Sequence, residues 1–238
     1  MPDPVIVADR LTLSRGGRAV LTGVDLTVQA GRVTGLVGPN GVGKSSLLAA
    51  AGGLLAYQGG SLRVGGREVA DDPRAARRAA RTASWPSPAN HALTGAAYLA
   101  FLRAHRRDAW RADTAEAAAE ASDLAPHLGR PITTYSHGTL AKLSLVAALG
   151  FEAETYLLDE ALNGLDHRAT TRLSALLRAE AAAGRAVVVA SHALAVLHRL
   201  CDDVVVLTGQ GSQAVLPGGP AGGDEATIEA ALEAAYDA

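Results

Sequence analysis

The chain has 238 residues, a formal net charge of −2 and a pI near 6.4. Its length is sufficient for one domain with a sizeable core, and its near-neutral charge gives no reason to expect a nucleic acid as partner. The single cysteine, Cys201, excludes an internal disulfide, and no apolar run approaches the roughly 18 residues of a membrane-spanning helix.

The beginning of the chain is predicted to form an antiparallel sheet. Apolar and polar residues alternate there, which is typical of strands with one buried face. Gly16-Gly17 marks a turn between two groups of such strands, and residues 59–69 have the pattern of a further hairpin. The first predicted strands are 5–8, 11–13, 19–21 and 24–28.

A glycine-rich segment, GPNGVGKSS, lies between the predicted buried strand 32–37 and the start of a helix at Leu47. This order and the spacing Gly-x-x-x-x-Gly-Lys-Ser are those of a phosphate-binding P-loop. Glycines let backbone N–H groups surround phosphate oxygens, and the helix N-terminus adds unpaired donors and a positive dipole. The residues predicted to bind ATP here are Gly38, Pro39, Asn40, Gly41, Val42, Gly43, Lys44, Ser45 and Ser46.

Within this loop two side chains have separate predicted roles. Lys44 is expected to reach the β- and γ-phosphates, and the Ser45 hydroxyl is expected to bind Mg²⁺. The alternative is a glycine turn that binds nothing. The composition argues against that alternative, because all 22 basic residues are arginines except Lys44 and Lys142. A compact ammonium group therefore stands where a phosphate ligand requires a point charge.

The remainder of the chain predicts an α/β fold after a mainly helical insert. An arginine-rich helical turn over 72–81 precedes alanine-rich helices over 91–128. Strands and helices then alternate, which favours a mostly parallel sheet with helices on both faces. The predicted strands are 155–158, 187–190 and 204–207, the predicted helices are 140–149 and 168–183, and the chain ends with a loop over 209–223 and a helix over 224–238.

Two adjacent carboxylates, Asp159 and Glu160, follow the predicted strand 155–158. Polar residues at the carboxyl ends of parallel strands line the ligand crevice of such folds. Asp159 is expected to hold Mg²⁺, and Glu160 is expected to act as the general base that activates the attacking water. The alternative is an acidic surface turn, which is less favoured when a P-loop is present in the same chain.

These motifs together resemble those of the nucleotide-binding subunit of an ABC transporter, over nearly the whole chain. Tyr135-Ser136-His137-Gly138-Thr139 resembles the family's signature, usually LSGGQ, and precedes a predicted helix. Asn163-Gly164-Leu165-Asp166 resembles the D-loop, which crosses the dimer interface. Ser191-His192 resembles the switch region. The resemblance implies that Ser136, His137 and Gly138 act on the ATP of a partner subunit, and that Asp166 and His192 contribute from the D-loop and at the γ-phosphate.

The resemblance also implies the architecture and the partners. It implies one ABC ATPase domain over 1–238, with a P-loop NTPase core, an antiparallel β subdomain and a helical insert. Its parts would be 1–84, 85–134, 135–208 and a peripheral segment, 209–238. ATP and Mg²⁺ are the expected cofactors. A second nucleotide-binding subunit and a separate membrane permease are the expected partners. The permease would hold this cytoplasmic chain at the inner face of the cell membrane, and the signature and D-loop favour export.

Three positions depart from the family pattern. Arg15 stands where an aromatic residue usually stacks on adenine, and its planar guanidinium can stack in the same way. Ser87 aligns with a glutamine that helps to bind Mg²⁺ and the attacking water. Ala161 replaces a proline after the two acids, with a small expected effect. The serine is too short to reach the metal directly, which predicts slower hydrolysis or altered coupling.

Two other functions are compatible with parts of the pattern. One is a partner subunit that binds ATP but leaves hydrolysis to another chain, which Ser87 and Arg15 favour and Glu160 and His192 oppose. The other is an ABC-type ATPase that acts on DNA or ribosomes. The chain has neither sustained coiled-coil heptads nor a second nucleotide domain, so this function is less favoured.

Overall fold

The computed structural model describes residues 3–83, 90–105, 109–208, 211–217 and 225–236. The chain divides into two compact units. The first, called the core unit, contains residues 1–82, 153–159 and 178–238. The second, called the helical unit, contains residues 83–152 and 160–177. Each unit is described below by itself.

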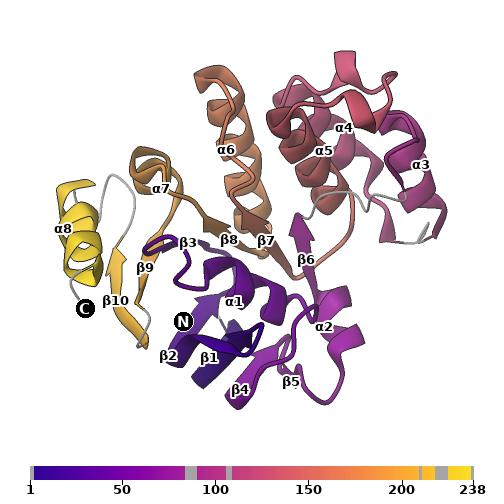
Figure 1. Ribbon diagram of the computed structural model, residues 1–238. Helices are drawn as coiled ribbons and strands as arrows, with labels where there is room; N and C mark the ends of the chain where they lie inside the picture. Colours follow the sequence, from indigo (N-terminus) through magenta and orange to yellow (C-terminus); the bar gives the residue numbers. More distant parts are fainter. Residues whose placement is uncertain (1–2, 84–89, 106–108, 209–210, 218–224, 237–238) are drawn as a thin grey trace. The chain divides into compact units, whose positions relative to one another are not determined.

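The larger sheet of the core unit has six strands in the order β10-β9-β3-β8-β7-β6. Its central strands are parallel, since β3 pairs with β8 and β9, and β8 pairs with β7 (Figure 1). The residues of β3 and β8 are all buried, as expected for parallel strands covered on both faces. The strands are β3 (Val33–Val37), β6 (Ala80–Ala83), β7 (Thr155–Asp159), β8 (Ala186–Ala190), β9 (Asp203–Thr208) and β10 (Gly211–Pro217).

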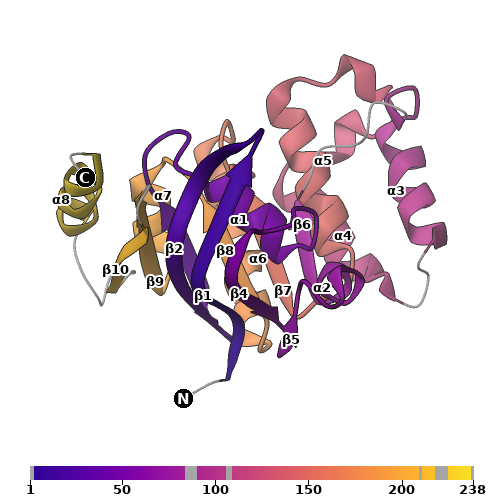
Figure 2. The same ribbon diagram turned by 60° about the horizontal axis from the view of Figure 1, so that its bottom comes forward.

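The smaller sheet of the core unit is antiparallel, in the order β2-β1-β4-β5 (Figure 2). Its two long strands form a hairpin that turns at Gly16-Gly17, as predicted. The alternation of buried and exposed residues along both strands places one face in the core, where Leu11, Leu13 and Leu21 are fully buried. The strands are β1 (Pro4–Arg15), β2 (Arg18–Gln29), β4 (Gly59–Val64) and β5 (Arg67–Glu68).

Helix α2 (Pro73–Ala79) of the core unit begins with two recognisable signals. Asp72 caps α2 by accepting a hydrogen bond from Ala75 N at 2.9 Å, and Pro73 occupies the first turn. At the opposite end of the sheet from the P-loop, Arg32 donates two hydrogen bonds to Asp203, at 2.7 and 2.8 Å. This bidentate pair raises the pKa of Arg32 and joins β3 to β9. The helices are α1 (Lys44–Ala51), α2 (Pro73–Ala79), α7 (Leu194–Leu200) and α8 (Glu225–Tyr236).

The helical unit is built around α5 (His137–Leu149), which packs against α3 and α4. Buried alanines of α4, including Ala115 and Ala118, allow the two helices to approach closely. Trp110 meets Phe151 edge to face, with ring centroids 5.0 Å apart. The other helices are α3 (Gly95–His105), α4 (Ala112–Ala121), the 3₁₀ turns Ala125–His127 and Ile132–Thr134, and most of α6 (His167–Ala182).

The predicted fold class is confirmed, because a mostly parallel sheet, an antiparallel sheet and a helical unit are all present. Two predicted segments differ from the structure. Residues 80 and 81 were expected to belong to the helical turn over 72–81, but they begin strand β6. Residues 209–223 were expected to form a loop, but Gly211–Pro217 pairs with β9 as an antiparallel strand. Helix α5 also belongs to the helical unit. This unit therefore extends beyond the helical insert that was expected over 85–134. Among the described residues no helix combines the length and the apolar character needed to cross a membrane.

Candidate nucleotide site

The P-loop connects a buried strand to a helix, as its sequence predicts. It follows β3 and ends where α1 begins, at Lys44. Lys44 is only 7% exposed, and its Nζ donates to the carbonyl oxygens of Gly38, at 2.8 Å, and Pro39, at 3.2 Å. The ammonium group is thus held against the backbone of its own loop. Ser45 is exposed at the first turn of the helix, where a hydroxyl ligand is required.

Two glycines of the loop have backbone conformations that side chains disfavour, but their surroundings differ. Gly38 has a φ of 155°, and a Cβ there would lie 2.6 Å from the backbone oxygen of Leu207 in β9. Gly41 has a φ of 81°, and a Cβ there would have no atom within 4 Å. The strand next to β3 therefore forbids a side chain at Gly38, whereas only the local conformation disfavours one at Gly41.

This difference predicts unequal effects of alanine at the two positions. Gly41→Ala should lower the free energy of unfolding by about 1 kcal/mol, the cost of one left-handed alanine. Gly38→Ala should lower it by about 3 kcal/mol, because a contact with a backbone oxygen is added to that cost. Urea denaturation of both variants measures the difference. Equal losses in the two variants would contradict the packing of the loop against β9.

Polar residues gather at one edge of the larger sheet. Asp159 ends β7 and pairs with Ala190 of β8, and Leu36 of β3 pairs with the same alanine from the other side. Asp159 thus lies two strands, or roughly 10 Å, from the strand that enters the P-loop. His192 follows β8 at this edge and is exposed, and the buried Ser191 Oγ accepts a hydrogen bond from Ala193 N at 3.1 Å.

The Asp159 carboxylate fits a metal ligand. Its Oδ1 is buried, and no described group donates a hydrogen bond to it. A buried polar atom without a partner costs free energy, unless a ligand supplies the missing interaction. Carboxylate and hydroxyl oxygens are ligands that suit Mg²⁺. Asp159 and Ser45 are therefore suited to the role predicted for them, and both belong to the core unit.

Glu160 follows Asp159 in the chain and begins a tight turn. Its backbone has a φ of 52°, in the left-handed region, which is uncommon for glutamate. The turn is held by a hydrogen bond from Asn163 N to Glu160 O, at 3.1 Å, and by the burial of Ala161 and Leu162. The side-chain amide of Asn163 also donates to Glu160 Oε2. The carboxylate predicted to be the general base is thus oriented by a residue of the predicted D-loop.

The predicted signature and D-loop come together within the helical unit. Ser136 caps α5, because its Oγ accepts a hydrogen bond from Thr139 N at 3.2 Å. A Cβ on Gly138 would lie 3.5 Å from the backbone oxygen of Gly164. Asp166 caps α6 by accepting a hydrogen bond from Ala169 N at 2.8 Å, and this bond lowers the pKa of its carboxyl. Ser136 and His137 are exposed at the start of α5.

The predicted residues therefore form two groups. The P-loop, Asp159 and His192 share the core unit, and Arg15 lies in the same unit at the turn between β1 and β2. The second group belongs to the helical unit, and Ser87 lies outside the described residues. Its members are Glu160, Asp166, Ser136, His137 and Gly138.

Two contacts in these groups were not expected from the sequence. The D-loop motif includes Asn163, but its hydrogen bond to Glu160 depends on the left-handed turn. Arg18 lies opposite Arg15 across the hairpin. The two-residue turn Gly16-Gly17 is visible in the sequence, and such a turn predicts that Arg15 and Arg18 are paired across the hairpin.

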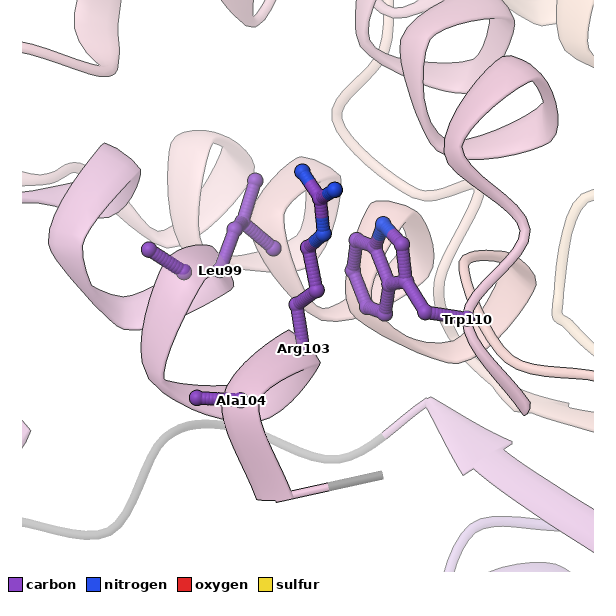
Figure 3. A pocket seen from close by; sticks show the side chains of 5 residues that line it. Leu99, Arg103, Ala104 and Trp110 are labelled. Carbon is purple, nitrogen blue, oxygen red and sulfur yellow. The ribbon is translucent and has the colours of Figure 1, made fainter. Parts of the chain in front are cut away.

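A hollow of about 480 Å³ lies elsewhere, in the helical unit. Figure 3 shows the Arg103 side chain, from α3, extending beside the ring of Trp110. None of the residues predicted to bind nucleotide lines this hollow. Its lining residues are Leu99, Ala100, Arg103, Ala104 and Trp110.

Comparison with known proteins identifies the family of the chain. Residues 21–163 match the family model described as ABC transporter. The hemin import ATP-binding protein HmuV of Streptomyces coelicolor is 39% identical over 236 residues, which cover 97% of this chain and 82% of that protein. The daunorubicin/doxorubicin resistance ATP-binding protein DrrA of Streptomyces peucetius is 31% identical over 209 residues, which cover 87% of this chain and 63% of that protein.

Solved structures are similar as well. One, described as the ATP binding subunit of an ABC transporter, has a TM-score of 0.78 and 25% identity, and the match covers 90% of each chain. A nucleotide-free ATP-binding cassette from an ABC transporter has a TM-score of 0.77 at 17% identity, which supports the fold alone. The family match spans the P-loop, the predicted signature and the two carboxylates. The chain therefore belongs to the ABC transporter family, as a single-domain ATP-binding subunit.

Proposed function

We propose that the chain binds and hydrolyses MgATP to drive a permease made of separate chains. The observation that carries this proposal is that the P-loop and Asp159 both lie at the carboxyl ends of the parallel strands of the larger sheet. There the P-loop, with Lys44 held against its backbone, lies two strands from Asp159, whose Oδ1 is buried without a donor. Phosphate and Mg²⁺ together would satisfy both groups.

Nucleotide binding follows from the groups of the core unit. Backbone N–H groups of the loop and of the first turn of α1 bind the phosphate oxygens. Lys44 exchanges its hydrogen bonds with Gly38 O and Pro39 O for bonds to the β- and γ-phosphates. Ser45 and Asp159 hold Mg²⁺, which neutralises charge on the phosphates when it is bound.

Hydrolysis requires a base and stabilisation of the γ-phosphate. The Glu160 carboxylate accepts a proton from the attacking water as the water oxygen bonds to the γ-phosphorus. The bond from this phosphorus to the bridging oxygen breaks, which leaves ADP and inorganic phosphate. His192 donates a hydrogen bond to a γ-phosphate oxygen, where negative charge is concentrated. The amide of Asn163 holds Glu160 in the required orientation.

The role of Asn163 gives a testable prediction. Asn163→Ala should lower kcat for ATP about tenfold and leave KM nearly unchanged, because the general base loses its orientation while the phosphate site stays intact. Asn163→Asp should shift the acid limb of the pH–rate profile to higher pH, because two adjacent carboxylates disfavour each other's ionised form. Steady-state phosphate release measures both effects.

An exposed amide outside the predicted motifs serves as the control. Gln58→Ala removes such a side chain from the core unit and should leave kcat and the pH profile unchanged. A rise in KM without a fall in kcat in Asn163→Ala would show that the amide supports nucleotide binding instead of the base.

Dimerisation completes the proposed site. The exposed Ser136 and His137, with the N–H of Gly138, would bind the γ-phosphate of ATP held by a second subunit arranged head to tail. Asp166 would lie in the loop that crosses between the subunits. Closure around two nucleotides and reopening after hydrolysis would drive the permease through a cycle of conformations.

The permease would place this subunit at the cytoplasmic face of the cell membrane. The relatives named above are associated with hemin import and with drug resistance, so export stays a prediction. Uptake and efflux assays with the matching permease would decide the direction. The name of the HmuV relative connects that protein with import, which favours a transporter over an ATPase acting on DNA or ribosomes.

Phosphate release from MgATP by the purified chain tests hydrolysis directly. A second function is favoured by Ser87, which stands where the family pattern has glutamine. It is a partner subunit that binds ATP and closes without turnover. Tight ATP binding without phosphate release, in the presence of the permease, would support that function and contradict ours.

A further inference from the structure

The hollow in the helical unit has one charged wall, which is formed by Arg103 in the last turn of α3. The Arg103 side chain is exposed, and within the described residues it has neither a hydrogen bond nor an ion pair. The carboxylate of Glu152 pairs instead with Arg111, with Oε2 and Nε 3.3 Å apart. The guanidinium group of Arg103 is therefore available to an external anion, and its planar fork can bind a carboxylate with two parallel hydrogen bonds.

Trp110 forms a second wall, and its ring is held in place by its neighbours. The ring meets Phe151 edge to face, with centroids 5.0 Å apart. A Cβ on Gly150 would lie 2.6 Å from Trp110 Cη2, so the ring lies directly against the glycine backbone. The backbone N–H of Arg111 donates to Gly150 O at 2.8 Å, which fixes the segment that carries the ring. The indole is thus already positioned for a ligand, so little ordering of this wall opposes binding.

The other walls are apolar, and the described side chains that line the hollow offer no hydrogen-bond acceptor. Leu99, Ala100 and Ala104 all come from α3. Figure 3 shows the Arg103 guanidinium beside the Trp110 ring, and both of these side chains carry donors only. The volume of about 480 Å³ is in the range of small-molecule sites. These surroundings suit a ligand with a flat apolar body and one anionic group.

We propose that this hollow binds a small aromatic carboxylate. The ring of the ligand packs against the Trp110 indole, and its carboxylate accepts hydrogen bonds from the Arg103 guanidinium. The lining residues all belong to the helical unit, so the site is complete within that unit. It is a second ligand site of the chain, and it does not depend on the proposed binding of MgATP at the P-loop.

Calorimetric titration of the full chain with naphthoate and with its neutral amide, naphthamide, tests the inference. Naphthoate should bind at one site per chain, at least about tenfold more tightly than naphthamide, because only the carboxylate forms charge-assisted hydrogen bonds. Arg103→Met keeps an apolar stem without the guanidinium, and should lower the affinity for naphthoate to that for naphthamide. No binding of naphthoate at millimolar concentration, or equal affinities of the wild-type chain for the two compounds, would overturn the inference.

Further variants locate the ligand. Ala100→Phe fills the hollow from an exposed position on α3 and should abolish binding of both compounds, while circular dichroism shows that the chain stays folded. Arg130→Met removes an exposed arginine of the same unit that does not line the hollow, and should bind naphthoate as the wild-type chain does. Lys44→Ala should also keep this affinity. Unchanged binding in Ala100→Phe, or a loss in Lys44→Ala, would place the ligand elsewhere and contradict the inference.

Discussion

Replacing Glu160 with glutamine is expected to lower ATP turnover at least about a hundredfold, while ATP binding persists. A general base contributes roughly 10²–10⁴-fold to a rate, and glutamine keeps the shape of the side chain without accepting the proton. Glutamine can also retain a hydrogen bond with Asn163, so the left-handed turn at this position should survive. Phosphate release measures the loss of turnover, and calorimetric titration with MgATP measures binding.

The same substitution should trap the closed dimer. Without hydrolysis, two ATP molecules would stay between the subunits, so light scattering of Glu160→Gln should show a dimer with MgATP and a monomer without it. Glu120→Gln changes an exposed carboxylate of α4 and should behave as the wild-type chain. Turnover unchanged in Glu160→Gln would exclude this residue as the base, and a monomer that binds ATP would point to a different partner subunit.

Replacing Lys44 with alanine should weaken ATP binding by about a hundredfold. The substitution removes a charge-assisted hydrogen bond to phosphate, for which about 1.5–3 kcal/mol is typical. It also leaves Gly38 O and Pro39 O without the donor that Lys44 Nζ provides, which loosens the loop before nucleotide arrives. Titration with MgATP measures the affinity, and thermal unfolding without nucleotide measures the effect on the loop itself.

The other lysine of the chain is a matched control. Lys142 lies on α5 in the helical unit, and Lys142→Ala removes the same charge at a position outside the P-loop sequence. Its ATP affinity should equal that of the wild-type chain. Lys44→Arg is expected to bind more weakly than wild type, because a planar fork does not replace a point charge in a closely fitted loop. Full affinity in Lys44→Ala would contradict phosphate binding at this loop.

Local sequence patterns were sufficient for elements whose signals are contiguous. The buried strand, glycine loop and helix around Lys44 form as predicted, because their residues follow one another and each conformation is set by its own residue types. The predicted helix over 168–183 is observed as α6, His167–Ala182, with Asp166 as its cap. The roles assigned to the site residues stay predictions, which the substitutions above test.

Patterns failed where a segment depends on a neighbour from elsewhere in the chain. Strand β10 lies in a glycine-rich segment that reads as a loop, yet it pairs with the edge of β9. That edge supplies backbone hydrogen-bond partners that the segment itself cannot provide. Conversely, the antiparallel hairpin at the beginning of the chain was predictable, since its two strands are joined by a two-residue turn.

The sequence by itself determined which chemical groups this protein has and which of them are neighbours along the chain. It contains the motif of a phosphate-binding loop, a pair of carboxylates and a helix start that resembles the family signature, because each is a short motif with local conformational preferences. Only the tertiary structure decided the distances between motifs. The register of β8 places Asp159 near the P-loop, and the contact between Leu21 and Gly43 joins β2 to the loop. Such contacts join residues far apart in the chain, so they depend on how whole strands pair and pack.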